Sequence, residues 1–284
     1  MITEKSSCPA YFNGRYMALD EVAISPLDRG FLLGDSIYEV IPVYHGVGLG
    51  AERHWQRLMA GLQAVGIESP YALSDWPGVA APLLSADEPA QMLYVQVTRG
   101  VEGSRKHRFP VLAEPTVLLF STSFQPPIDG SYAGCAGHLQ ADLRWQRCNV
   151  KSTSLMGNVL AYRQLYTDGV ADDEALLVRD GRVVEAPSSN LFIACDGVIR
   201  TPPLDNILPG VSRSLVIELA RGEGLKVIEQ APDIAQLTAA DEVWVTNSYE
   251  ELKPIVTVDG DPIGSGRPGP VWRCLLERYQ ALKR

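Results

Sequence analysis

Apolar residues recur at spacings of three and four between residues 51 and 65. The recurring positions are Trp55, Leu58, Leu62 and Val65. This spacing places apolar side chains on one face of an α-helix, so it predicts a helix over 51–65. Shorter apolar runs around this helix predict β-strands, because their length and content are typical of strands. The strands predicted in this part of the chain are 40–44, 92–98 and 116–121.

The second half of the chain carries a similar mixture of strand and helix patterns. Short apolar runs predict strands at 175–179, 191–194, 243–246 and 255–258. Longer periodic runs predict helices near 157–167, 211–222 and 271–282. There is no internal repeat and no low-complexity tract. The pattern indicates a fold of the α+β or α/β class.

A proline pair and a glycine interrupt the pattern in the segment Phe124-Gln125-Pro126-Pro127-Ile128-Asp129-Gly130. Proline stiffens the chain and glycine commonly ends a regular element, so we expect a linker at 124–130. A chain of 284 residues is long enough for two domains. We therefore predict a small N-terminal α/β domain at 1–123 and a large C-terminal domain at 131–284.

The composition narrows the classes of partner and location. A formal net charge of -9 argues against nucleic acid as a partner, because binding a phosphate backbone requires a basic surface. No apolar run approaches the roughly 18 residues of a membrane span, and residues 1–5 lack the apolar core of a signal peptide. We expect a cytoplasmic protein without a membrane partner.

The cysteines are odd in number and scattered along the chain. They are Cys8, Cys135, Cys148, Cys195 and Cys274. None belongs to a Cys-x-x-Cys pair, which favours reduced thiols over disulfides or zinc ligands. Cys148 is expected to be a small buried side chain. The sequence therefore predicts no metal site.

One lysine stands out in the segment Cys148-Asn149-Val150-Lys151-Ser152-Thr153-Ser154-Leu155-Met156-Gly157-Asn158. Lys151 lies between an apolar residue and a run of small hydroxyls, so it can be partly desolvated. Desolvation disfavours the charged form of a lysine, and a neutral amine is the form that condenses with an aldehyde. A solvated surface lysine is the alternative interpretation of this segment.

Two further segments carry chemistry that complements a reactive lysine. Glu185 lies between two apolar strand-like runs, where a carboxylate could hold a protonated ring nitrogen. Residues 206–213 place a proline, a glycine and a hydroxyl ahead of a helical pattern, and a helix N-terminus favours a phosphate. A solvated glutamate and an ordinary helix cap would explain each segment separately. Together with Lys151 they suggest pyridoxal 5'-phosphate.

At this point the chain resembles the class IV, or fold-type IV, pyridoxal-phosphate aminotransferases, with D-amino acid aminotransferase as the most similar member. The resemblance covers nearly the whole chain. Besides the segments above, it rests on Tyr11-Phe12-Asn13-Gly14, Asp28-Arg29-Gly30-Phe31-Leu32-Leu33-Gly34-Asp35-Ser36-Ile37-Tyr38-Glu39-Val40 and His54-Trp55-Gln56-Arg57-Leu58. The resemblance implies a two-domain fold with the cofactor in the interdomain cleft.

The resemblance also implies roles for individual residues. Lys151 would be the catalytic Schiff-base lysine, and Glu185 would hold the pyridine nitrogen. The phosphate ligands implied are Arg57, Val211, Ser212 and Ser248. Further cofactor-binding residues implied are Asn247, Leu208 and Arg144.

Substrate binding is implied for three other residues. Arg105 and His107 form an Arg-x-His pair on a predicted loop, and Tyr38 matches a third member of the same group. In D-amino acid aminotransferase this pair reaches across a dimer interface and binds the substrate α-carboxylate, so a homodimer is implied. Arginine meets a carboxylate with a planar fork, which suits this role. A basic, solvated loop tip is the alternative interpretation.

The sequence departs from the family pattern at a few positions. Lys106 stands between the two members of the pair, and Ala186-Pro187 follows Glu185. Asn247 occupies a position where a hydroxyl is expected. These changes would affect side-chain selectivity and hydrogen bonds around the ring, while every reacting group is kept.

The function implied is a transamination from D-amino acids, of the D-alanine and D-glutamate type, to 2-oxo acids by a ping-pong mechanism. Two alternatives stay open. One is a transaminase for branched-chain L-amino acids or for (R)-amines. The other is a lyase of the aminodeoxychorismate type. Arg105 and His107 favour the first function, because branched-chain enzymes bind the carboxylate by a different arrangement.

Overall fold

The computed structural model describes residues 8–110, 113–127 and 133–283. The chain divides into two compact units. Unit 1 comprises Met1–Gln125 together with Val150–Ser154, and unit 2 comprises Pro126–Asn149 together with Leu155–Arg284. The division falls inside the expected linker 124–130, of which residues 128–130 lie outside the described residues.

The structure differs from the predicted domains in the segment around Lys151. Residues 131–284 were expected to form one domain, whereas Val150–Ser154 belongs to unit 1. The reason is main-chain pairing: Tyr38 N donates to Lys151 O at 3.0 Å, and Thr153 N donates to Ser36 O at 3.2 Å. These bonds add the lysine segment to a strand of unit 1.

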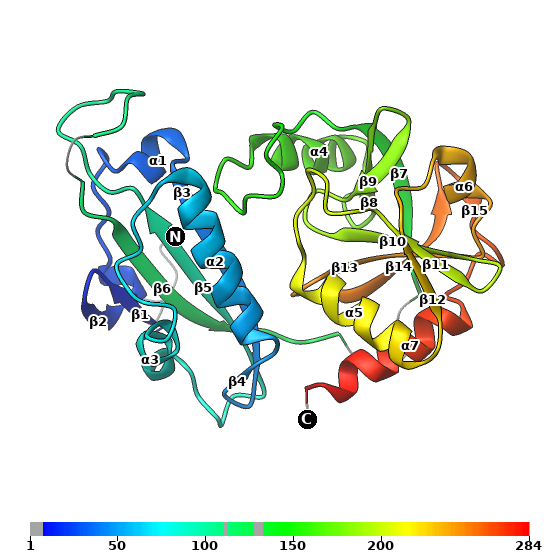
Figure 1. The fold of residues 1–284 in the computed structure, drawn as a ribbon, viewed down its shortest axis with the longest axis horizontal. Coiled ribbons are helices and arrows are strands. Elements are labelled where there is room, and N and C mark those ends of the chain that lie inside the picture. The colour runs from blue at the N-terminus through cyan, green and yellow to red at the C-terminus, as the bar shows by residue number, and fades with distance from the viewer. Residues whose placement is uncertain (1–7, 111–112, 128–132, 284) are drawn as a thin grey trace. The chain divides into compact units, whose positions relative to one another are not determined.

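Unit 1 is built on a six-stranded sheet with the order β2-β1-β6-β5-β3-β4 (Figure 1). Its strands are β1 Pro9–Phe12, β2 Arg15–Ala18, β3 Ser36–Tyr44, β4 Val47–Gly48, β5 Ala90–Thr98 and β6 Thr116–Ser123. All neighbouring pairs in this sheet are antiparallel. Its helices are η1 Leu19–Glu21, α1 Arg29–Leu33, α2 Ala51–Val65, α3 Trp76–Ala80 and η2 Ala81–Leu83. The apolar face of α2 and the side chains of β3 and β5 form its core.

Unit 2 is built on a nine-stranded mixed sheet. Its strands are β7 Cys135–Ala141, β8 Glu174–Arg179, β9 Arg182–Glu185, β10 Asn190–Cys195, β11 Val198–Thr201, β12 Lys226–Glu229, β13 Glu242–Asn247, β14 Glu251–Val258 and β15 Asp261–Pro262. The path from β10 through β13, β14, β7, β8 and β9 returns to β10, because Asn190 pairs with Glu185. This part of the sheet therefore closes on itself, with Glu185 at the point of closure.

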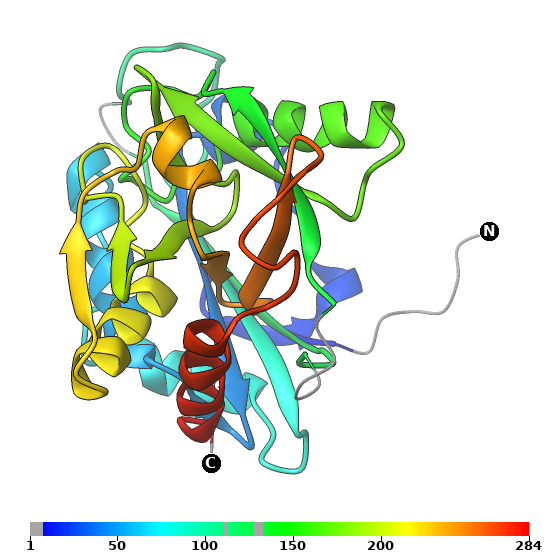
Figure 2. The same cartoon turned by 90° about the vertical axis from the view of Figure 1, so that its right-hand side faces the viewer.

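The helices of unit 2 are α4 Met156–Thr167, α5 Val211–Gly222, α6 Ile234–Thr238 and α7 Pro270–Ala281. Figures 1 and 2 show α5 and α7 side by side, where both also contact β13. In the described part of the chain, no helix combines the length and apolar character that crossing a membrane requires.

The predicted helices over 51–65 and 211–222 match α2 and α5 at both ends. The predicted strands all fall within observed strands, and the mixed α and β class is confirmed. Several strands have no counterpart in the predictions, and all of them except the seven-residue β7 have between two and four residues. They are β1, β2, β4, β7, β9, β11, β12 and β15. Short strands contribute few apolar positions, so their pattern in the sequence is weak.

Candidate functional site

The first group of candidate residues, called the lysine cluster here, consists of Lys151, Tyr38, Glu39, His54 and Arg57 in unit 1. Strand β3 positions Tyr38 and Glu39, and helix α2 positions His54 and Arg57. The main-chain bond from Tyr38 to Lys151 holds the lysine beside the start of β3. The fold therefore brings together residues that are far apart in the sequence.

The amine of Lys151 lies over an aromatic ring. Its Nζ atom is 4.2 Å from the centroid of the Tyr38 ring, and the side chain is half-buried. Within the described residues, no carboxylate forms an ion pair with this amine. A lysine held by a ring face, with no acid beside it, retains its capacity to bond to an aldehyde.

Arg57 is held by a fully buried carboxylate. Glu39 accepts hydrogen bonds from Arg57 Nε at 2.6 Å and Nη2 at 2.9 Å, and it lies 2.8 Å from His54 Nδ1. Burial acts to raise the pKa of Glu39, but Arg57 and His54 outweigh it and lower the pKa to about 2. Burial lowers the pKa of His54. The arginine is thus fixed by a carboxylate that stays ionised.

Glu39 and His54 were not among the predicted site residues. A signal for Glu39 was present, because an acidic residue lies directly beside the apolar run 40–44. A second signal was the spacing of His54 and Arg57, which places them on the same side of a helix. Arg57 uses Nε and Nη2 for Glu39, and its role as a phosphate ligand remains a prediction.

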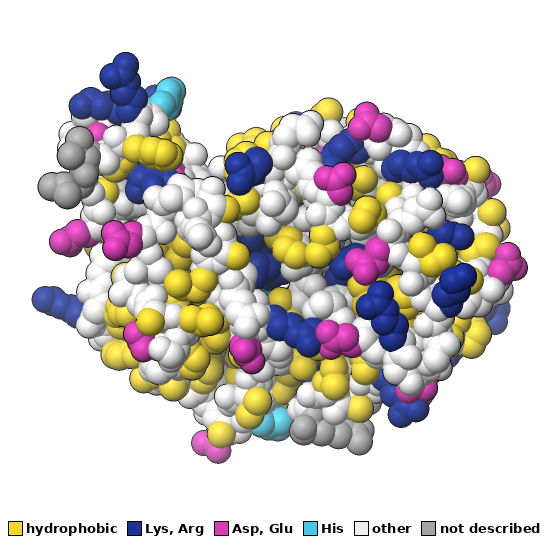
Figure 3. Space-filling model, viewed as in Figure 1, with side chains coloured by type: hydrophobic (Ala, Val, Ile, Leu, Met, Phe, Trp, Pro, Cys, Tyr) yellow, Lys and Arg dark blue, Asp and Glu magenta, His cyan; other side chains and the backbone are white. Residues whose placement is uncertain are grey.

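The predicted substrate residues Arg105 and His107 lie on an exposed loop after β5. Figure 3 shows basic side chains gathered on this loop. Neither Arg105 nor His107 has a side-chain hydrogen bond or ion pair in the described part of the chain. Tyr38, the third predicted member, stacks on Tyr94 with ring centroids 5.9 Å apart. Among the described contacts, none joins the two loop residues to Tyr38 or Lys151.

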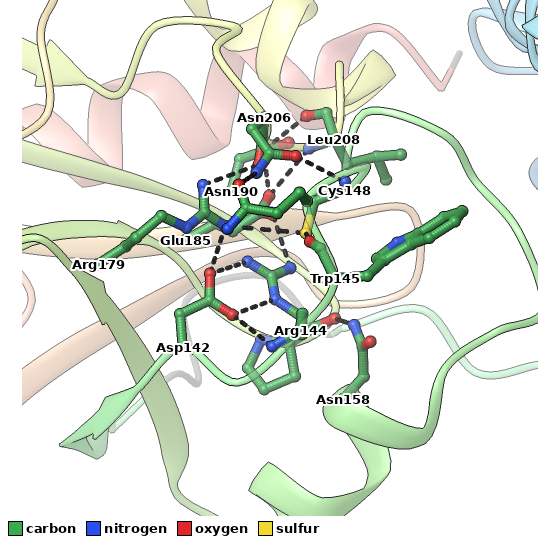
Figure 4. A network of polar contacts seen from close by, with 12 residues as sticks. Asp142, Arg144, Trp145, Cys148, Asn158, Arg179, Glu185, Asn190, Asn206 and Leu208 are labelled. Carbon is green, nitrogen blue, oxygen red and sulfur yellow. Dashed lines mark hydrogen bonds and ion pairs between the residues drawn. The ribbon is translucent and has the colours of Figure 1, made fainter.

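The second group of candidate residues, called the glutamate cluster here, lies in unit 2 (Figure 4). It consists of Glu185, Arg144, Asp142, Arg179, Asn190 and Leu208. Glu185 ends β9 and is 2% exposed. Its Oε1 atom is 2.7 Å from Arg144 Nη1, and its Oε2 atom accepts from Asn190 Nδ2 and from Leu208 N, both at 3.2 Å.

Asp142 fixes the orientation of Arg144. The aspartate accepts from Arg144 N at 3.1 Å, Nε at 2.9 Å and Nη2 at 3.0 Å, and Arg179 Nη2 lies 2.5 Å from its Oδ2. Figure 4 shows the resulting chain of side chains from Arg179 to Glu185. Opposite charges alternate along it, so each buried ion has a partner.

Burial raises the pKa of Glu185 to about 7, against the opposing effect of Arg144 and the Leu208 N–H. Asp142 raises the pKa of Arg144, which stays charged. A buried carboxyl with a pKa near neutrality can exchange a proton with a heterocyclic nitrogen of similar basicity. The geometry is suited to the role predicted for Glu185. The structure places the predicted residues Arg144 and Leu208 against Glu185.

The N-terminus of α5 lies next to this cluster. Gly210 is the N-cap, and a Cβ at this position would lie 2.0 Å from Asn190 Oδ1. Glycine therefore allows the helix to begin against the residue that holds Glu185. The N–H groups of Val211 and Ser212 belong to the first helical turn, where no acceptor is available within the helix. The Ser212 hydroxyl lies 3.0 Å from the Tyr279 hydroxyl of α7.

Asn247 is the last residue of β13, and Ser248 follows it. Asn247 Oδ1 accepts from the N–H groups of Tyr249 at 2.8 Å and Glu250 at 2.6 Å, so this side chain stabilises the turn. Its Nδ2 atom donates to Ser189 Oγ at 2.9 Å. Ser248 is half-buried in the same turn. Cofactor binding by these two residues remains a prediction.

Comparisons with known proteins agree with these features. The family model for amino-transferase class IV matches residues 36–258, which include both clusters. A D-alanine aminotransferase of Bacillus licheniformis is 35% identical over 271 residues, covering 95% of each chain. A D-alanine aminotransferase of Staphylococcus aureus (strain MSSA476) is 33% identical over 273 residues, covering 95% of this chain and 96% of the relative.

A solved structure supports the fold. The branched-chain amino acid aminotransferase of T.th., complexed with N-(5'-phosphopyridoxyl)-L-glutamate, superposes with a TM-score of 0.89. The match covers 99% of this chain and 95% of that chain, at 23% sequence identity. At this identity the likeness establishes the fold alone.

Proposed function

The chain belongs to the class IV aminotransferases, and from this premise we propose that it transfers the amino group of D-amino acids to 2-oxo acids. D-Alanine and D-glutamate are the proposed types of donor, and the two half-reactions follow each other in a ping-pong order. Members of the family use pyridoxal 5'-phosphate. The identity to curated D-alanine aminotransferases over 95% of the chain supports this choice of substrate.

The described residues fit this cofactor. Lys151 offers an amine with no acid partner, Glu185 offers a buried carboxyl, and the first turn of α5 offers N–H groups for a phosphate. Because Gly210 has no side chain, the first turn of α5 can begin beside Asn190, which binds Glu185. The carboxyl of Glu185 and the N–H groups of α5 therefore lie close together. We propose that Arg57, Val211, Ser212 and Ser248 hold the phosphate, and that Arg144, Leu208 and Asn247 complete the cofactor site.

Pyridoxal phosphate supplies the aldehyde carbon and the electron sink when it is bound. Lys151 would hold the cofactor through its Nζ amine, and the same amine is proposed to take the proton from the substrate Cα. Glu185 is proposed to hold a proton at the ring nitrogen, and Arg144 orients that carboxyl. The Tyr38 ring limits the movement of Nζ, so the lysine acts from one side.

The observation that carries the choice of substrate is the pair Arg105 and His107. Both side chains are exposed, and no described group uses their hydrogen-bonding capacity. An arginine fork and an imidazole two residues apart are suited to an α-carboxylate, which amino acids and 2-oxo acids share. We propose that the pair acts on a neighbouring subunit of a homodimer, where Tyr38 of that subunit completes the carboxylate site. A cytoplasmic location also stays a prediction.

A half-reaction tests the proposal. The purified yellow protein is mixed separately with D-alanine, L-leucine and (R)-1-phenylethylamine, and the loss of the yellow absorbance is followed. We expect rapid conversion by D-alanine and slow or no conversion by the other two. Pyruvate should then restore the yellow colour, since a transaminase returns to its first form with a 2-oxo acid.

Other outcomes would redirect the proposal. Conversion by L-leucine or the amine alone would support a branched-chain or (R)-amine transaminase and overturn the D-amino acid assignment. Release of pyruvate from 4-amino-4-deoxychorismate would support the lyase alternative. Heat-denatured protein with the same amount of cofactor is the control for reaction in free solution.

A further inference from the structure

Two buried arginines contact the loop that carries Arg105 and His107. Residues 103–109 are all exposed, whereas Arg29 and Arg99 are 4% and 8% exposed. Both arginines bind one carboxylate, Asp35. We call Arg29, Asp35 and Arg99 the arginine hub.

The side chain of Arg29 binds the main chain of the loop. Its Nη1 atom donates to Lys106 O at 2.7 Å and to Arg108 O at 3.2 Å, and it lies 3.2 Å from Glu102 Oε2. The two carbonyl groups lie on either side of His107 in the sequence. One guanidinium therefore restrains the segment in which Arg105 and His107 are placed.

Arg99 joins the same loop to the core of unit 1. Its Nε and Nη2 atoms bind Asp35 at 2.8 and 2.9 Å, and its remaining donors reach the carbonyl groups of Val65 and Gly66, each at 2.7 Å. Its guanidinium carbon lies 4.4 Å from the centroid of the Phe109 ring. The end of α2 and the end of the loop are thus linked through one side chain.

Asp35 connects the hub to the residues of the lysine cluster. It directly precedes β3, and Tyr38 lies three positions further along the chain. Arg99 N donates to Asp35 O at 3.1 Å, and Arg29 N donates to Gly100 O at 2.9 Å. Burial acts to raise the pKa of Asp35, but Arg99 and Arg29 keep it below its ordinary value. Asp35 is therefore joined both to the main chain that leads to Tyr38 and to the start of the loop.

We propose that the arginine hub consists of positioning residues that fix the carboxylate-binding loop, and thereby the placement of Arg105 and His107 for substrate. The inference rests on the proposed function, because it assumes that this loop binds the carboxylate. Replacing a buried ion pair by apolar packing is often neutral or stabilising, so two buried arginines on the half-buried Asp35 next to an exposed loop indicate a need for fixed geometry. Loop residues with solvated carbonyl groups would otherwise move freely.

The test compares the holoenzymes of Arg29→Gln, Arg29→Lys and wild type. Arg29→Gln removes the charge and most donors, whereas Arg29→Lys keeps the charge without the planar fork. The matched control is Arg278→Gln, which removes an exposed arginine and its ion pair with Glu223 in unit 2. For each protein, kcat and KM are measured with D-alanine and with pyruvate, and trypsin cleavage after Arg105, Lys106 and Arg108 is followed.

We expect Arg29→Gln to raise KM for both substrates by about tenfold or more, with kcat changed by less than about threefold, because positioning of a shared binding group is lost. Cleavage in the loop should accelerate at the same time, and the yellow absorbance should stay near the wild-type value. The Tm should fall, because the partners of a buried arginine lose their contacts. Arg29→Lys should recover part of the KM, and Arg278→Gln should match wild type.

Two results would overturn the inference. One is faster cleavage with an unchanged KM, which would mean that the hub holds the loop without any effect on substrate. The other is an unchanged cleavage rate together with unchanged kinetics. Where Arg29→Gln does not fold, Glu102→Gln weakens the hub from the loop side, and the same two readouts apply. Wild-type protein that fails to convert D-alanine overturns the proposed function instead, and the cleavage assay needs no substrate.

Discussion

The Nζ atom of Lys151 lies 4.2 Å from the centroid of the Tyr38 ring, and the main chains of the same two residues are joined by a hydrogen bond of 3.0 Å. The pair is therefore held at both the main chain and the side chain. A change at either residue should alter the placement of the amine. The ring of Tyr38 contacts the amine, whereas its hydroxyl is proposed to bind the substrate carboxylate. Mutation can therefore test these two parts of Tyr38 separately.

Replacing the lysine tests the covalent role of its amine. Lys151→Ala should lower turnover by on the order of a thousandfold or more and remove the yellow absorbance, because no other residue supplies the amine. Circular dichroism and Tm should stay close to wild type, since the side chain is half-buried and has no ion pair among the described residues. Lys226→Ala, at an exposed lysine, is the control. Retained steady-state activity in Lys151→Ala would refute the mechanism.

Removing only the hydroxyl of Tyr38 tests its part in carboxylate binding. Tyr38→Phe keeps the ring over Lys151, so the yellow absorbance should persist. We expect KM for D-alanine to rise by about tenfold, as for the loss of a hydrogen bond to a charged group, with a small change in kcat. Steady-state kinetics of the two proteins provide the measurement. A large fall in kcat without a change in KM would assign the hydroxyl to the chemical step instead.

Removing the basic pair tests the recognition of a shared group. The double variant Arg105→Ala, His107→Ala should raise KM for D-amino acids and for 2-oxo acids together, by about a hundredfold, because both lose a charge-assisted contact to the carboxylate. The rate with an amine that lacks a carboxylate should not fall in parallel. Unchanged KM values would mean that substrate binds elsewhere.

The carboxyl of Glu185 is expected to matter more for chemistry than for cofactor binding. Glu185→Gln should lower kcat by roughly a hundredfold, because an amide cannot hold a proton at the ring nitrogen as a carboxylate does. Cofactor affinity, measured by titration of the cofactor-free protein, should change much less. Glu277→Gln, at an exposed glutamate of α7, controls for the loss of a negative charge. A variant that loses the cofactor but keeps its kcat when saturated would contradict this division.

The pair of Glu39 and Arg57 predicts a pH dependence of stability. Arg57 and His54 lower the pKa of Glu39 from 4.5 to about 2, so the folded protein binds its proton less readily than the unfolded chain. The stabilisation is fully present above pH 4.5 and is lost as the pH falls toward about 2. His54 acts in the same direction, because its pKa is lowered as well.

The measurement is the difference in Tm between wild type and Glu39→Gln across this pH range. We expect wild type to be the more stable protein near neutral pH, and we expect the difference to shrink in acid. A difference that is constant with pH would show that the carboxylate charge does not stabilise the fold.

Local patterns determined much of the secondary structure. Apolar periodicity predicted both ends of α2 and α5. Each helix buries one face, and the apolar residues of that face recur in the sequence at spacings of three and four. Short edge strands such as β2 and β12 were missed, because half of their residues face solvent and give no clear period.

The sequence by itself determined which residues carry the proposed chemistry: a lysine beside hydroxyls, an acid between apolar strand-like runs, a glycine before a helix and a basic pair on a loop. Only the tertiary structure decided which unit holds Lys151, since that depends on hydrogen bonds to β3 between residues distant in the chain. It also decided the partners of the buried charges, Glu39 with Arg57 and Asp35 with Arg29 and Arg99. Ion-pair partners depend on the register and packing of distant elements, and no local pattern of residue types records that.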